Sequence, residues 1–99
     1  MKEYQVVIPP VVEDKIREQA LFIAKDKPAV ALEWYVHIFE KIDTLESMPD
    51  RCPEAPESPY VRYILRHLLI GEYRVLFRLV DDCVRILDFK GGGQNSRQL

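Results

Sequence analysis

Apolar residues are densest between positions 60 and 90, and their pattern predicts three consecutive β-strands. Residues 61–70, 73–80 and 83–90 are rich in Val, Ile, Leu, Tyr and Phe, which is the composition of strands. Gly71-Glu72 and Asp81-Asp82 separate these segments, and both pairs are typical of tight turns. We therefore expect an antiparallel meander in this part of the chain.

Alternation along the second of these strands separates apolar side chains from arginines. The apolar face comprises Tyr73, Val75, Phe77 and Leu79. The opposite face comprises Arg74, Leu76, Arg78 and Val80. Because successive side chains of a strand point to opposite faces, one face of the sheet should be core. The other face should stay partly open and present guanidinium groups, which recur along the meander as Arg62, Arg66, Arg74, Arg78 and Arg85.

Three elements are predicted before the meander. Residues 3–8 alternate in polarity and predict a first strand, whereas residues 11–25 and 28–47 carry apolar residues at spacings of three and four, as helices do. The connection at 25–27 is short, so the helices should form an antiparallel hairpin packed on the sheet. Asp26 is the residue expected to cap the second helix. The cluster Trp34, Tyr35 and Phe39 should lie in the core.

The expected fold is therefore α+β, with the order β-α-α-β-β-β and a mainly antiparallel four-stranded sheet in a single domain, residues 1–99. Residues 48–60 hold four of the seven prolines and predict an extended connection between the second helix and the meander. Residues 91–99 begin with three glycines and predict a flexible tail.

Composition excludes some classes of protein and favours others. No apolar run approaches the length of a membrane span, and the N-terminus is too short and polar for a signal peptide, so we expect a cytoplasmic protein. Cys52 and Cys83 should be free thiols there, and neither they nor the histidines have a metal-site spacing. Residues 51–99 carry eight basic residues, seven of them arginines, against six acidic residues. Arginine suits planar contacts to phosphate or carboxylate groups.

The chain resembles the RelE/ParE superfamily of bacterial type II toxins over nearly its whole length. The segments that carry the resemblance are EYQVVIPPVVEDKI, WYVHIFEKIDTLESMPDRCPEAPE and RHLLIGEYRVLFRLVDDCVRILDF. The resemblance implies a toxin of a plasmid-stabilisation module that is neutralised by a cognate antitoxin. It implies one of two targets, DNA gyrase for ParE-like members or mRNA in the ribosome for RelE-like members. No cofactor or metal is implied, and an open sheet edge would also admit a homodimer.

The resemblance also suggests functional residues. RelE-like ribonucleases use basic residues on the first meander strand, where Arg66 matches, or His67 if the register differs by one. They use an arginine after a tyrosine on the next strand, where Arg74 follows Tyr73. These are the catalytic candidates, although alternation puts His67 on the face opposite Arg66. The binding candidates are Arg62, Tyr73, Arg78, Lys90 and Arg97.

The C-terminus departs from the RelE-like pattern. Many relatives have a basic, histidine-containing run after the last strand, but this chain continues from Lys90 with Gly91-Gly92-Gly93-Gln94. Cleavage of RNA needs groups that take up and release protons, and arginine stays protonated. We therefore favour ParE-like gyrase inhibition over mRNA cleavage, which would make the protein an enzyme. A degenerate, non-toxic member that only binds an antitoxin is the third alternative.

Overall fold

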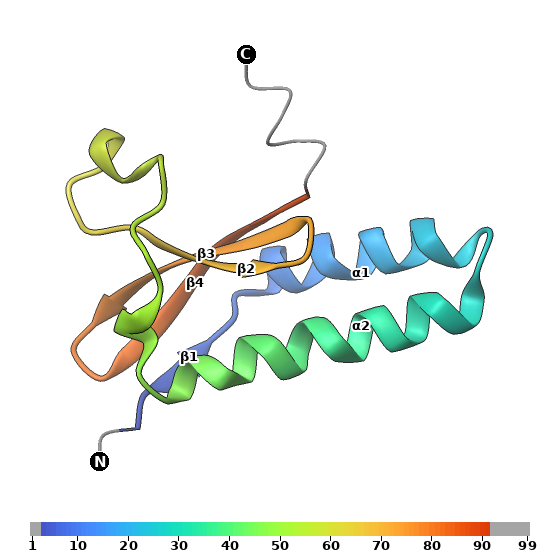
Figure 1. Cartoon of the computed structure of the whole chain (residues 1–99), viewed down its shortest axis with the longest axis horizontal. Coiled ribbons are helices and arrows are strands. Elements are labelled where there is room, and N and C mark those ends of the chain that lie inside the picture. The colour runs from blue at the N-terminus through green and yellow to red at the C-terminus, as the bar shows by residue number, and fades with distance from the viewer. Residues whose placement is uncertain (1–2, 92–99) are drawn as a thin grey trace.

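The computed structural model describes residues 3–91, and its elements follow the predicted β-α-α-β-β-β order (Figure 1). The helices and strands are β1 (Gln5–Val7), α1 (Pro10–Ala24), α2 (Pro28–Asp43), β2 (Arg66–Ile70), β3 (Tyr73–Val80) and β4 (Cys83–Lys90). Short 3₁₀ turns occupy Thr44–Glu46, Pro49–Arg51 and Ser58–Tyr60. Neither helix in this part of the chain is long and apolar enough to cross a bilayer.

The four strands form one sheet in the order β1-β4-β3-β2. β2, β3 and β4 pair antiparallel, which confirms the predicted meander, and β1 joins the sheet as a parallel neighbour of β4. Gly71 and Asp81 have φ angles of 60° and 55° in the two turns, a conformation that Gly adopts freely and that Asp tolerates. The predicted turn pairs are therefore confirmed.

The helical hairpin packs on one face of the sheet and makes the main core with it. Val12 and Ile16 of α1 and Ile38 of α2 are fully buried in the same cluster as Val75 and Phe77 of β3. Trp34, Tyr35 and Phe39 pack against this cluster, as predicted. Figure 1 shows that the joined ends of the helices extend past the sheet. This overhang agrees with the exposure of Leu21, Phe22 and Leu32.

Several predicted boundaries are wrong, and some elements end earlier than predicted. The first strand covers Gln5–Val7 and not 3–8, and α2 ends at Asp43 and not at residue 47. After α2, the Thr44 hydroxyl donates to the Lys41 carbonyl over 2.6 Å, and Met48 has a φ of 50°, which stops helix propagation. Asp26 does not cap α2: Lys27 holds that position, without a side-chain cap.

The first meander strand is also shorter than predicted. β2 begins at Arg66 rather than at residue 61. Before it, Leu65 donates its backbone N–H to the Ser58 hydroxyl over 3.0 Å and accepts from the Ala55 N–H over 2.7 Å. Because these groups bond to the preceding connection, residues 61–65 lie outside the β2–β3 ladder.

That connection, residues 48–60, folds over the sheet instead of running extended. It contains two of the 3₁₀ turns, and its Ala55 packs with Leu65 and Leu76 in a second buried cluster. Leu76 lies on the face of the sheet away from the helices, which we call the outer face. The outer face is therefore partly covered by the connection, and the predicted open arginine face is only partly correct.

A β-bulge changes the side-chain pattern of β4. The β3–β4 register shifts between Leu76, which pairs with Asp88, and Phe77, which pairs with Ile86. As a result Ile86 and Phe89 are both buried in the main core although they are three residues apart. A bulge inserts one extra residue in this way and re-aims the residues that follow. Here it leaves Lys90 directly opposite Arg74.

Candidate functional site on the outer face of the sheet

Arg74 is the centre of a polar cluster on the outer face. Its Nη1 lies 3.0 Å from Oε1 of Glu57, and its Nη2 lies 2.6 Å from Oε2. The Arg74 side chain is only 12% exposed, whereas that of Glu57 is 37% exposed. Two parallel hydrogen bonds between a guanidinium and a carboxylate fix both groups. Glu57 therefore ties the covering connection to β3.

His67 of β2 completes this cluster. Its Nδ1 lies 3.0 Å from Nη1 of Arg74. Because a guanidinium only donates hydrogen bonds, Nδ1 is the acceptor and the ring is neutral in this geometry. Burial, and then the positive charge of Arg74, lower the pKa of His67 below its usual value of 6.5. We call Glu57, His67 and Arg74 the outer-face triad.

The charges around the triad are mutually compensated. The hydrogen bond from Arg74 lowers the pKa of Glu57 to about 2, so this carboxylate is ionised at neutral pH. Lys90 stands opposite Arg74 in the ladder, and its Nζ lies 3.9 Å from Asp88. Asp88 also pairs with Lys15 of α1 over 2.6 Å. Acidic and basic groups thus alternate at this end of the sheet.

The triad combines a carboxylate, a neutral imidazole and a guanidinium, which is a set able to bind anions or hold a proton. The sequence pointed to Arg74 and His67 separately, through strand position and residue type. It did not point to Glu57, which lies in the proline-rich connection seventeen positions before Arg74. No helical or strand periodicity relates the two positions, so only the folded connection brings them together.

Arg66, the other catalytic candidate, lies elsewhere. It occupies the side of β2 that faces the helices, and its Nη1 donates to the Cys52 carbonyl over 2.7 Å. Leu68 and Ile70, two and four residues further along, are both in the main core. Since side chains alternate along a strand, Arg66 is on the face opposite His67 and Arg74. The structure therefore brings together Arg74 and His67 and leaves Arg66 apart.

Tyr73 lies on the core side of β3. Its ring stacks on Phe89 at 5.4 Å and meets Trp34 edge-on at 5.1 Å, and its hydroxyl is 3.3 Å from Nε2 of Gln19. Burial raises the pKa of its hydroxyl. Tyr73 is thus part of the aromatic packing between helices and sheet, with only its hydroxyl reaching a polar side chain.

The remaining binding candidates are dispersed. Arg62 is exposed in the segment before β2. Arg78 stacks on Tyr63, with its guanidinium carbon 4.1 Å from the ring centre. Lys90 belongs to the charged end described above, and Arg97 and most of the predicted tail lie outside the described residues. Cys52 and Cys83 are free thiols, as expected, and burial raises the pKa of Cys52.

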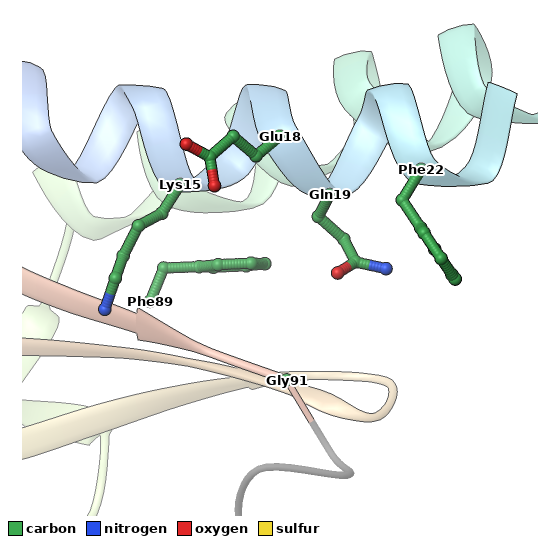
Figure 2. A pocket seen from close by; sticks show the side chains of 6 residues that line it. All are labelled: Lys15, Glu18, Gln19, Phe22, Phe89 and Gly91. Carbon is green, nitrogen blue, oxygen red and sulfur yellow. The ribbon is translucent and has the colours of Figure 1, made fainter. Parts of the chain in front are cut away.

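A half-open hollow of about 260 Å³ lies between α1 and the end of β4 (Figure 2). Its lining residues are Lys15, Glu18, Gln19, Phe22, Phe89 and Gly91. Figure 2 shows the Phe89 ring between the helix and the strand, with the polar side chains along α1 around it. The hollow is on the helix side of the sheet, so it is separate from the outer-face triad.

Comparisons with known proteins agree with this architecture. The chain is similar to a solved structure titled "Chromosomal ParDE TA system from P. aeruginosa", with a TM-score of 0.68 and 17% identity over 90% of this chain and 96% of that one. No curated protein matches the sequence. The family described as "ParE toxin of type II toxin-antitoxin system, parDE" matches residues 6–95. The chain therefore belongs to the ParE toxin family of type II toxin–antitoxin systems.

Proposed function

We propose that this ParE-family toxin arrests growth in the cytoplasm by binding and inhibiting DNA gyrase, and that a cognate antitoxin neutralises it. The observation that carries the proposal is the separation of Arg66 and Arg74 on opposite faces of the sheet. A ribonuclease needs cations that converge on one phosphate to neutralise its developing charge. A toxin that inhibits its target by binding to it needs a complementary surface, and it does not need cations that converge on one phosphate.

The hydrogen bonds that Arg74 already makes also support inhibition by binding. Both of its terminal nitrogens already bond Glu57. Glu57, with a pKa of about 2, is a poor base at neutral pH. In this proposal Glu57 keeps Arg74 in a fixed position, and the triad gives the outer face the shape that the target contacts.

One observation favours mRNA cleavage as a second candidate. His67 and Glu57 both lie near Arg74, and a neutral imidazole beside a carboxylate can transfer protons. In that case a bound phosphate would replace Glu57 on Arg74, and His67 would carry the proton.

Pulse labelling after induced expression, without an antitoxin, separates the two candidates. Gyrase inhibition predicts that thymidine incorporation falls before amino-acid incorporation, and that purified toxin blocks supercoiling by purified gyrase. Arg74→Gln should weaken both effects at least tenfold, whereas Arg66→Gln and the exposed control Arg17→Gln should retain them. Each variant is checked for folding by circular dichroism.

The opposite order of events would overturn the proposal. If amino-acid incorporation falls first and His67→Ala abolishes the effect, mRNA cleavage is the function. If neither label falls while the soluble protein accumulates, the chain is an antitoxin-binding module without toxicity. Light scattering of the purified protein would separately show whether it forms the homodimer that an open sheet edge would admit.

A further inference from the structure

Arginine side chains in residues 3–91 fall into two groups according to their partners. Four of the seven donate hydrogen bonds to an acceptor: Arg17 to Asp14, Arg51 to backbone carbonyls, Arg66 to Cys52 and Arg74 to Glu57. Within the same residues no acceptor is found for the other three, which are Arg62, Arg78 and Arg85. Two of these three are neighbours in the sheet.

Arg78 of β3 and Arg85 of β4 are directly paired across the antiparallel ladder. Residues on either side of them, Phe77, Val84 and Ile86, are buried in the main core. Alternation therefore puts both guanidinium groups on the outer face. Directly opposite residues have Cβ atoms about 5 Å apart, so the two cations can reach one common ligand.

This pairing costs stability in the isolated protein. Like charges directly opposite each other repel, and Nε of Arg78 is buried without a hydrogen-bond acceptor in residues 3–91. The Tyr63 ring, 4.1 Å from the guanidinium carbon, holds Arg78 in place. A buried unsatisfied donor calls for an explanation such as a bound ion. An anion that bonds the terminal nitrogens of Arg78 and Arg85 would remove the repulsion.

The surroundings favour a phosphodiester as that anion. Guanidinium groups bind phosphate oxygens in bidentate fashion. The segment that supplies Tyr63 also carries Arg62 and two exposed apolar side chains, Tyr60 at 87% and Ile64 at 54% exposure. Aromatic side chains interleaved with arginines are typical of surfaces on which nucleic-acid bases stack.

We propose that Arg78 and Arg85 form a phosphate-binding pair through which this protein contacts the backbone of a nucleic acid directly. This contact goes beyond the proposed inhibition of gyrase and does not depend on it. Since the whole chain has a net charge of −2, attraction is confined to this part of the surface, and binding should be weak at physiological salt.

The test is fluorescence anisotropy of the purified full chain with a labelled 30-base-pair DNA duplex, and separately with a labelled single-stranded RNA. Titrations run from 50 to 200 mM salt. Each phosphate contact contributes about one unit to the slope of log K against log salt concentration. Arg85→Gln should lower the slope by about one unit, and the double variant with Arg78→Gln by about two.

Arg17→Gln is the matched control, because it removes the same charge from an exposed position on α1. It should leave binding unchanged. Arg85 is exposed, so Arg85→Gln keeps the test valid even if substitution of Arg78 disturbs folding. If the substitutions of Arg85 and Arg78 weaken binding to only one of the two nucleic acids, the result supports the phosphate-binding pair and identifies which nucleic acid it contacts.

Two results would overturn the proposal. One is the absence of binding to both nucleic acids at 50 mM salt, or binding that Arg85→Gln and Arg17→Gln weaken equally. The other is binding to a polyglutamate peptide that depends on Arg78 and Arg85 while nucleic-acid binding does not. That result would assign the pair to an acidic protein segment instead.

Discussion

Each end of the outer face carries a cross-strand pair of basic residues, but carboxylates neutralise only one of the two pairs in the described part of the chain. At one end Arg74 faces Lys90, and at the other Arg78 faces Arg85. Glu57 and Asp88 neutralise the first pair with contacts of 2.6 and 3.9 Å. The second pair meets an aromatic ring, Tyr63, and no carboxylate in the described part of the chain.

The difference lies in what covers each pair. The connection between α2 and β2 delivers a carboxylate to Arg74 and a tyrosine ring to Arg78. An internally paired arginine is fixed but occupied, so a ligand must displace its partner. An arginine that is stacked but unpaired is fixed and available. The same short segment thus makes one end of the face structural and leaves the other end ready for an anion.

The largest effect should follow removal of the neutralising carboxylate. Glu57→Gln removes the carboxylate charge that pairs with the largely buried Arg74, so we expect a loss of about 1–2 kcal/mol in the free energy of unfolding, after allowance for solvent screening of the partly exposed Glu57. Urea denaturation measures this loss. Glu54→Gln is the control, because Glu54 is exposed in the same connection. Equal effects of the two variants would contradict a structural role for the Glu57–Arg74 pair.

Acid should weaken the pairing of Glu57 with Arg74, and so lower the stability of the protein, over a defined pH range. The pKa of Glu57 is lowered from 4.5 to about 2 in the folded protein. Its contribution to stability is therefore complete above pH 4.5 and is lost as the pH falls towards 2. Thermal unfolding across this range should show a step in the wild type that is smaller in Glu57→Gln. The same step in both proteins would assign the acid sensitivity to other carboxylates.

The smallest effect on stability is expected at the end of the outer face that holds Arg78 and Arg85. There the substitution should stabilise the protein instead of destabilising it. Arg85→Gln relieves the repulsion with Arg78 and should stabilise the fold by about 0.2–1 kcal/mol at low salt. The gain should shrink as salt screens the two charges. Urea denaturation at two salt concentrations measures it, with Arg17→Gln for comparison. A loss of stability in Arg85→Gln would mean that Arg85 makes a stabilising contact.

Local patterns in the sequence predicted much of this fold. Alternation identified the core face of β3, with Val75 and Phe77 fully buried. Gly71 and Asp81 marked both hairpin turns. The three-and-four spacing of apolar residues identified both helices. These predictions succeeded because each depends on residues within a few positions of one another, where backbone geometry repeats with a fixed period.

The sequence by itself determined the residue types of the outer face, its arginines above all, and the meander that displays them. Only the tertiary structure decided which arginines are neutralised. The prolines of residues 48–60 suggested an extended connection, but burial of Ala55 against Leu65 and Leu76 folds this segment over the sheet. That packing brings Glu57 to Arg74 and Tyr63 to Arg78, and contacts between residues so far apart in the chain leave no periodic signal in its sequence.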